Sequence, residues 1–279
     1  MSERTVRVGG AERRLTLHDP GGAGPVPLIL AFHGRWSSAR ELAAATALHR
    51  RANRAGAAVA YLHGVRDGWG DDPLPTDARP DPDADLRFAA AAVRDLVEAG
   101  VADRDRVSAV GHSNGGAMAL RLAAERPGLL AAAAAVAGQL PEGVTPRAAV
   151  PVFLVYGTAD PMRPADGLPG PHDPSADGPT PSLSIGATAA AFAGDGAVAD
   201  ERRLPDRDPA DGTTVARTAW QAPGGAPVVL WLVEGGGHTW PGARGAPPSE
   251  GLGAVSRDLD ATAVLVDAVL AQRAPRIAP

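Results

Sequence analysis

Ser113 stands in a sequence setting that favours nucleophilic chemistry. It is the centre of the pattern Gly-x-Ser-x-Gly, with glycines at positions 111 and 115. A short apolar run at 107–110 precedes the pattern, and strong helix formers follow from 117 to 125. A strand, a sharp turn and a helix in this order expose a serine nucleophile at a helix N-terminus, where developing negative charge is favoured. We therefore predict a nucleophile here, rather than a serine in an ordinary glycine-rich turn.

A serine nucleophile needs a histidine base and an acid that orients the base. In a parallel sheet these residues lie in loops at the carboxyl ends of strands, in the order serine, acid, histidine. Asp160 follows the apolar run 152–156, and His238 follows the apolar run 228–233. Both the positions and the order match. The sequence predicts a triad of Ser113, Asp160 and His238, with the glycine run before His238 bringing its ring close to other backbone.

The remaining site residues are predicted from their places after strands. Backbone N–H groups of Asn114 and Arg35 are the expected donors to the oxyanion, so their side chains matter little. His33 opens the loop after the run 27–32 and is a candidate for bracing that turn or lining the substrate site. His112 is expected to point away from the Ser113 hydroxyl and to pack structurally.

Composition excludes several other chemistries. The chain has 279 residues and a net charge of −5, without a basic block, which argues against nucleic acid as a partner. It has no Cys, and all 27 basic residues are Arg. Thiolate catalysis, Schiff-base chemistry and the P-loop lysine are therefore ruled out.

No metal or organic cofactor is expected. The cluster Asp81-Pro-Asp83-Ala-Asp85 is similar to a calcium loop but lacks Gly at its sixth position and Glu at its twelfth. Capping of the following helix is the simpler interpretation. No His and Glu spacing indicates zinc.

Buried strands alternate with amphipathic helices along most of the chain, which predicts an α/β fold whose mostly parallel sheet is covered on both faces. We expect one domain over 1–279, an irregular insert at 166–182 and a flexible tail at 273–279. The expected strands are 5–8, 13–17, 27–32, 57–62, 107–110, 129–137, 150–156, 213–221 and 227–234, and the expected helices are 38–54, 85–99, 114–126, 187–193 and 255–272.

The N-terminus shows no apolar core of signal-peptide length, and the longest apolar run, 129–137, is too short to span a bilayer. We therefore expect a soluble protein with no membrane partner, located by default in the cytoplasm, with export left open.

Several motifs together resemble the polyhydroxybutyrate depolymerase and feruloyl esterase-like group of α/β-hydrolases, over most of the chain from Leu28 to Val269. The most specific is Gly236-Gly-His-Thr-Trp-Pro-Gly242. The other matching motifs are Asp103-Arg-Asp-Arg-Val107, Gly111-His-Ser-Asn-Gly-Gly116, Ala119-Leu-Arg-Leu-Ala123, Gly157-Thr-Ala-Asp-Pro161, Asp211-Gly-Thr213 and Gly68-Trp-Gly-Asp-Asp72. The resemblance implies the α/β-hydrolase fold, the same triad and hydrolysis of carboxylic esters.

The resemblance leaves the substrate open between hydroxybutyrate-type polyesters and hydroxycinnamoyl esters, so the expected partner is a small-molecule or oligomeric ester. Secreted relatives usually carry an export signal and often cysteines, and this chain has neither. Trp69 and Trp240 are candidates for flat surfaces that contact substrate, or for simple loop packing. An acyltransferase or peptidase would use the same triad. A non-catalytic binding protein on a hydrolase scaffold is the alternative from another class.

Overall fold

The computed structural model describes residues 1–279 except 23, 67, 176–177, 222–224, 244–250 and 275–279. Among the described residues, ten strands form one sheet in the order β1-β2-β4-β3-β5-β6-β7-β10-β9-β8. The strands are β1 Ser2–Val8, β2 Ala11–His18, β3 Val26–Phe32, β4 Ala58–Leu62, β5 Ala102–His112, β6 Ala132–Val136, β7 Val152–Gly157, β8 Val198–Arg203, β9 Thr214–Gln221 and β10 Val228–Glu234.

The centre of the sheet is parallel and its two edges are antiparallel. Strands β4, β3, β5, β6, β7 and β10 pair in parallel. The hairpin β1–β2 joins β4 antiparallel, and β9 and β8 continue antiparallel from β10. Residues of the central strands are buried on both sides of the sheet, which explains why their sequences are continuous apolar runs rather than alternating patterns.

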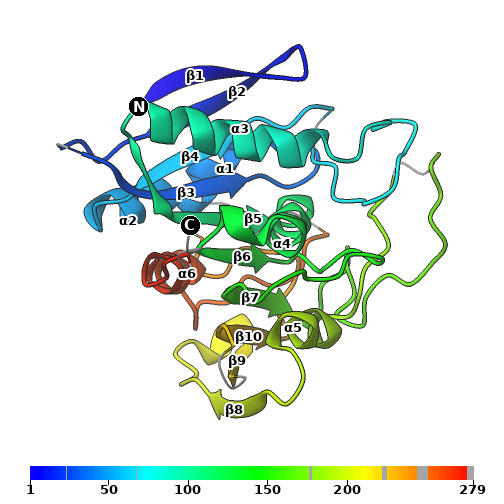
Figure 1. Cartoon of the computed structure of the whole chain (residues 1–279). Coiled ribbons are helices and arrows are strands. Elements are labelled where there is room, and N and C mark those ends of the chain that lie inside the picture. Colours follow the sequence, from blue (N-terminus) through cyan, green and yellow to red (C-terminus); the bar gives the residue numbers. More distant parts are fainter. Residues whose placement is uncertain (23, 67, 176–177, 222–224, 244–250, 275–279) are drawn as a thin grey trace.

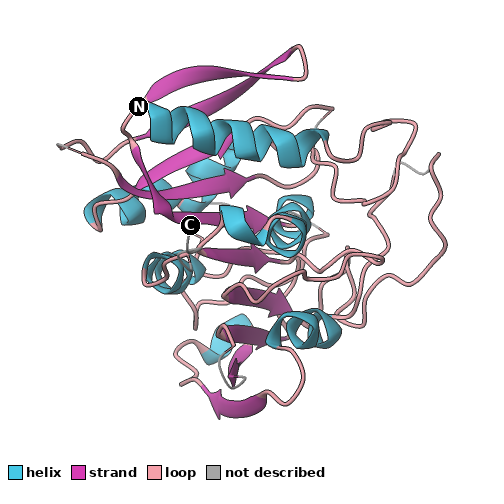
Figure 2. Cartoon of the chain, viewed as in Figure 1, coloured by secondary structure: helices cyan, strands magenta, loops and turns pink. Residues whose placement is uncertain are grey.

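Helices cover both faces of the sheet, as Figures 1 and 2 show. The apolar core of one face includes side chains of α3, α4 and α5, and that of the other includes side chains of α1, α2 and α6. The helices are α1 Ala39–Thr46, α2 Leu48–Arg54, α3 Ala84–Glu98, α4 Asn114–Glu125, α5 Ile185–Ala193 and α6 Ala261–Leu270, with short 3-10 turns at Pro127–Leu129 and Pro209–Asp211. This is the α/β-hydrolase fold, as predicted.

Two expected helices differ from the structure, and one strand was not expected. The helix predicted over 38–54 is two helices, because Ala47 has a left-handed backbone (φ 48°) that ends α1. The helix predicted over 255–272 begins only at Ala261, since the preceding residues form a loop in which Asp258 accepts N–H groups of Arg207 and Asp208. Strand β8 was not expected in the polar stretch that contains it.

The insert at 166–182 packs along the loop that follows β4. In its described residues it is irregular, as expected, apart from isolated bridges at Ser182. His172 Nδ1 lies 3.0 Å from Asp72 Oδ2, the Pro174 carbonyl accepts the Asp77 N–H, and Thr180 donates to Asp71 Oδ1. Within the described part of the chain, no helix has the length and apolar character that crossing a membrane requires. Residues 275–279 of the expected tail lie outside the described residues.

Candidate active site

Ser113 sits on a strained turn between β5 and α4. Its backbone has φ 56° and ψ −123°, a region that residues with a Cβ seldom adopt, and its N–H donates to the Val136 carbonyl at 2.8 Å. The two flanking glycines make the turn possible. A Cβ on Gly111 would lie 2.0 Å from the Gly115 carbonyl oxygen, and one on Gly115 would lie 2.2 Å from the Phe32 carbonyl oxygen. The turn therefore requires glycine at both positions.

The structure brings the three predicted triad residues into one line of hydrogen bonds. His238 Nε2 lies 2.8 Å from Ser113 Oγ, and His238 Nδ1 lies 2.6 Å from Asp160 Oδ2. Because an ionised carboxylate only accepts, Nδ1 carries the proton and Nε2 is left to accept the serine O–H. The side chain of Asp160 is fully buried, and the imidazole of His238 is 7 % exposed.

Local backbone contacts fix the acid and the base. Asp160 Oδ1 accepts the N–H groups of Met162 and Arg163, each at 2.8 Å, so one carboxylate oxygen orders the turn while the other faces His238. The His238 N–H donates to the Leu252 carbonyl at 2.7 Å. A Cβ on Gly237 would lie 2.0 Å from that same carbonyl oxygen, so the glycine run does bring the base against other backbone, as predicted.

The loop that follows β3 lies against the nucleophile. A Cβ on Gly34 would be 3.4 Å from Ser113 Cβ, which places the next residue, Arg35, at the edge of the site. Asn114 is the first residue of α4, and N–H groups in the first turn of a helix have no acceptor within it. Both backbones are thus near enough to Ser113 to serve as the predicted oxyanion donors.

The side chain of Asn114 has a role that the sequence did not reveal. Its Oδ1 accepts the Trp69 N–H at 2.7 Å, and its Nδ2 donates to the Trp69 carbonyl at 3.1 Å. Asn114 is 4 % exposed, so this pair of bonds is shielded from water. The residue after the nucleophile therefore also holds the loop that follows β4.

An apolar cavity of about 360 Å³ opens at Ser113 and His238. Its wall is mostly apolar and includes two tryptophans; the main apolar lining residues are Trp36, Leu42, Ala45, Met162, Trp240, Ala243, Leu252 and Val255. A larger cavity of about 1040 Å³ lies between the N-terminal hairpin and α1 and α2, and neither Ser113 nor His238 lines it. The smaller cavity is the one that can hold a reacting group.

The three candidate substrate residues are placed differently. Trp240 lines the cavity, and its indole N–H donates to Thr262 Oγ1 at 3.0 Å. Trp69 is fully buried outside the cavity lining, and its indole N–H donates to the His33 carbonyl at 2.8 Å. His33, 2 % exposed, accepts the Gly64 N–H and bonds the Gly34 carbonyl. Of the two interpretations left open for Trp69 and His33, these contacts favour loop packing over contact with substrate.

Trp36 was not among the predicted site residues, although it lies at the cavity mouth. Its side chain is 63 % exposed and its backbone is left-handed (φ 59°). A bulky residue in this conformation is unusual, and unusual backbone conformations are often found at ligand sites. The available sequence signal was its place in His33-Gly-Arg-Trp36, directly after the predicted oxyanion residue.

His112 also lines the cavity, contrary to a purely structural packing role. Its ring centroid is 5.4 Å from that of His238 and 6.1 Å from that of Trp240. Burial, with a smaller contribution from the charge of His238, lowers the pKa of His112 to about 3. The ring is therefore neutral at physiological pH.

The acidic cluster before α3 forms an internal charge network rather than a helix cap. Asp83 occupies the cap position without a side-chain cap bond and instead pairs with the buried Arg121 at 2.8 Å. Asp85, 2 % exposed, pairs with Arg13 at 2.8 Å and accepts the Gly70 N–H at 2.7 Å. In the described part of the chain, no group of three or more His, Asp or Glu residues could hold a metal ion.

Three comparisons with known proteins bear on this site. Residues 83–140 match the model of the prolyl oligopeptidase family. The chain is similar to the Nocardia uniformis subsp. tsuyamanensis protein named "Putative esterase NocK", with 45 % identity over 282 residues, 96 % of this chain and 82 % of the relative.

The chain also aligns with solved structures of low sequence identity, of which native sOPH supports the same fold. The crystal structure of native sOPH aligns with a TM-score of 0.50 and 16 % identity, over 68 % of this chain and 74 % of that one. An S-formylglutathione hydrolase from Agrobacterium tumefaciens aligns with a TM-score of 0.48 and 14 % identity, over 57 % of this chain and 75 % of that one.

Proposed function

Because the chain belongs to the same esterase family as its Nocardia relative and is a carboxylic ester hydrolase, we propose that it acts through an acyl-enzyme formed on Ser113. The observation that carries this proposal is the continuous hydrogen-bonded line from Ser113 through His238 to Asp160 at the mouth of an apolar cavity. A base on one side and an orienting acid behind it are the parts that serine acyl transfer needs.

The proposed mechanism gives each of these residues a defined role. His238 Nε2 takes the Ser113 proton as Oγ attacks the ester carbonyl, and Asp160 stabilises the resulting imidazolium. The N–H groups of Asn114 and Arg35 donate to the oxyanion. His238 then protonates the leaving alcohol, and in the second half it activates the water that releases the acid. No step requires a cofactor.

The size and lining of the cavity favour ester substrates with a compact apolar or aromatic acyl group. Its volume, about 360 Å³, is within the range of small-ligand sites, and Trp36 and Trp240 offer aromatic surfaces. Both hydroxycinnamoyl and short hydroxyalkanoyl groups suit such walls. We therefore place the substrate in these two classes, in line with the resemblance to feruloyl esterases and polyhydroxybutyrate depolymerases.

The test is a panel of p-nitrophenyl esters of increasing acyl length, hydroxycinnamoyl esters and a matched p-nitroanilide. We expect turnover of esters and little of the anilide. Ser113→Ala should lower kcat by about 10⁴-fold or more, because the covalent step is lost. Circular dichroism of both proteins checks that the variant folds.

Labelling by a fluorophosphonate provides a second readout that does not depend on the choice of ester. The wild type should be labelled at Ser113, and Ser113→Ala should not. Absence of both turnover and labelling in the folded wild type would contradict the proposal and favour a binding protein. Faster cleavage of the anilide than of the ester would indicate a peptidase.

A further inference from the structure

His112 differs from the other polar side chains that line the cavity outside the triad. Apart from the exposed Trp36, each of the others has a partner within the protein. Ser37 donates to Glu41 at 3.1 Å, Thr46 to the Leu42 carbonyl at 2.7 Å, Thr239 to the Ala254 carbonyl at 2.9 Å, Trp240 to Thr262 at 3.0 Å, and Arg35 lies 3.8 Å from the Asp71 carboxylate. These polar groups already have partners within the protein.

Neither ring nitrogen of His112 has a hydrogen-bond partner among the described residues, and its Nε2 is buried without one. An imidazole in an apolar wall that makes no hydrogen bond costs stability, and such groups call for an explanation in a native structure. Since Nε2 is shielded from solvent and the ring lines the catalytic cavity, Nδ1 is the ring nitrogen that a ligand in the cavity can reach.

The position of the ring limits which ligand group it can reach. His112 directly precedes Ser113, and its Nδ1 lies 3.5 Å from the Cβ that a side chain at Gly34 would have. Its ring lies near the rings of both the base and Trp240. A substituent that meets this ring must therefore lie close to the carbonyl under attack, not at the far end of the acyl chain.

We propose that His112 is a specificity-determining residue, which hydrogen-bonds a hydroxyl or carbonyl substituent one or two carbons from the scissile carbonyl of the acyl group. This inference rests on the proposed ester hydrolysis. The neutral imidazole offers one N–H donor and one nitrogen acceptor, so it can bind either kind of substituent. Burial keeps the pKa of the ring low, so protonation does not interfere near neutral pH.

The experiment compares the hydrolysis of ethyl butyrate with that of ethyl 2-hydroxybutyrate and ethyl 3-hydroxybutyrate. The rate of each reaction is measured from the acid that it releases. The measured quantity is the ratio of kcat/KM for each hydroxy ester to that for ethyl butyrate. In the wild type at least one ratio should exceed one. In His112→Phe, which keeps a planar ring without polar atoms, that ratio should fall about five-fold or more.

Two conservative variants separate recognition from packing. His112→Asn keeps a polar group near Nδ1 and His112→Gln keeps one near Nε2, so at least one should retain most of the preference. Met162→Ala removes an apolar part of the wall and should change kcat/KM of all three esters alike. If a substitution at His112 also disturbs His238, kcat/KM should fall equally for all esters, so the ratio of the hydroxy ester to ethyl butyrate stays the same.

The outcomes are distinct. A preference that disappears in His112→Phe and returns with Asn or Gln supports the proposal. A wild type without preference, or equal ratios in wild type and His112→Phe, overturns it while ester hydrolysis stands. No hydrolysis of any ester by the wild type would count instead against the proposed function.

Discussion

At the scale of single residues, the hydroxyl of Thr262 connects two parts of the cavity wall. Thr262 Oγ1 accepts the Trp240 indole N–H at 3.0 Å and donates to the Thr46 carbonyl at 2.9 Å. Thr46 is the last residue of α1, and Thr262 lies in the first turn of α6. The orientation of the Trp240 ring therefore depends on contacts with two helices that are far apart in the sequence.

Replacing the Thr262 hydroxyl should remove the hydrogen bonds that orient Trp240 while keeping the volume of the side chain. In Thr262→Val the Trp240 N–H and the Thr46 carbonyl both lose a partner, so we expect the free energy of unfolding to fall by about 1–3 kcal/mol. KM for aromatic acyl esters should rise several-fold with a smaller effect on kcat. Urea unfolding and steady-state kinetics measure both.

Thr262→Ser is the matched control, because it keeps the hydroxyl and loses only a methyl group. It should stay close to wild type in KM. A Ser variant as impaired as the Val variant would show that the methyl group, not the hydroxyl, holds Trp240.

The sequence alone was enough to predict the three triad residues, but it could not predict which aromatic side chains line the cavity. Ser113, Asp160 and His238 each follow a strand whose carboxyl end meets the others at one sheet edge, so their convergence follows from topology. Trp69 and Trp240 also follow strands, yet only Trp240 lines the cavity. The direction of a loop side chain depends on contacts such as the Trp69 bond to the His33 carbonyl, which have no local sequence pattern.

At the scale of elements, α4 is joined to the loop after β4 by a single buried cation. Arg121 is 1 % exposed and donates to the carbonyl oxygens of Gly70, Asp72 and Pro82 at 2.8–2.9 Å. It also pairs with Asp83 and Glu125, each at 2.8 Å. The nucleophile helix and the loop that contains Trp69 are therefore fixed to each other.

Removing this arginine should destabilise the protein strongly. Arg121→Met keeps the aliphatic length but leaves three carbonyls without this donor and Asp83 with only the more distant Arg126, so the free energy of unfolding should fall by about 3–5 kcal/mol. Lysine should rescue little, because it cannot reach these acceptors in a planar fork. Chemical denaturation measures the change.

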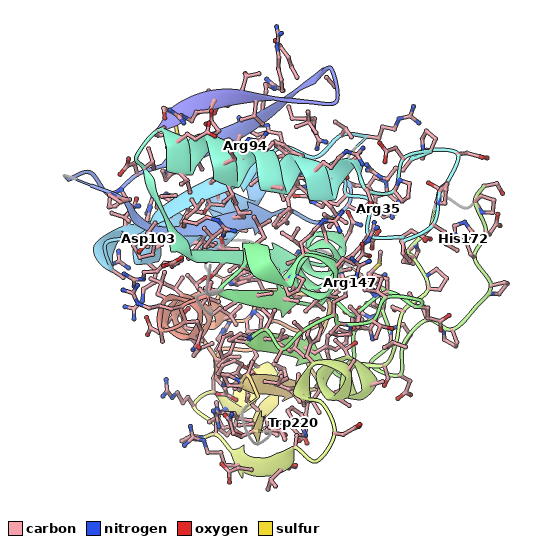
Figure 3. The ribbon with its side chains drawn as sticks, in the orientation of Figure 1. Arg35, Arg94, Asp103, Arg147, His172 and Trp220 are labelled. Atoms are coloured by element: carbon pink, nitrogen blue, oxygen red, sulfur yellow. The ribbon has the colours of Figure 1, made fainter. Side chains whose placement is uncertain are left out.

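Arg94 on α3 provides the control for charge and length. It is exposed, and Figure 3 labels it on that helix. Arg94→Met should change the free energy of unfolding by no more than about 0.5 kcal/mol. If both variants lose the same stability, the contacts of Arg121 do not explain its effect.

The elements that the sequence missed lack the usual local signals. Strand β8 is exposed along its whole length and therefore has no apolar periodicity. The break between α1 and α2 falls on Ala47, a good helix former, rather than on Gly or Pro. Asp258 and Ser256 look compatible with a helix, but both are used in loop contacts with residues of 207–213. Tertiary contacts decide all three.

At the scale of the whole molecule, the large cavity beside the N-terminal hairpin contains three histidines whose pKa values lie below the ordinary value. These residues are His18, His49 and His63. Burial is the main cause in each, and the pKa of His49 falls to about 4, helped by the nearby charges of His18 and Arg50. The folded protein thus holds these rings neutral at pH values where the unfolded chain would protonate them.

Stability should therefore fall on acidification from pH 6.5 towards pH 4. In that window the unfolded chain binds more protons than the folded protein, which favours unfolding. In His49→Gln the free energy of unfolding should depend less steeply on pH between 7 and 5. A group that binds one full proton more in the unfolded state changes the free energy of unfolding by about 1.4 kcal/mol per pH unit. We expect the slope to decrease by only a fraction of this value, because solvent screens a partly exposed ring.

Urea titrations at several pH values measure this slope, and measurements at pH 8 show any change from the substitution itself, since His49 is then neutral in both states. An unchanged slope in His49→Gln would show that other groups cause the acid sensitivity.

Ala274, the last residue that the structure describes, lies far from the catalytic serine. The Ala274 N–H donates to the Asp105 carbonyl at 2.8 Å, near the amino end of β5, whereas Ser113 follows the carboxyl end of the same strand. The six steps of strand from Val107 to Ser113 alone account for about 20 Å at the usual rise. Figure 1 shows the N-terminus on the side opposite the loops that carry the site, and Figure 3 labels Asp103 and Arg35 on these two sides. A bead or carrier protein coupled behind α6 would therefore leave the cavity facing the solution, which makes this end the natural point for oriented immobilisation.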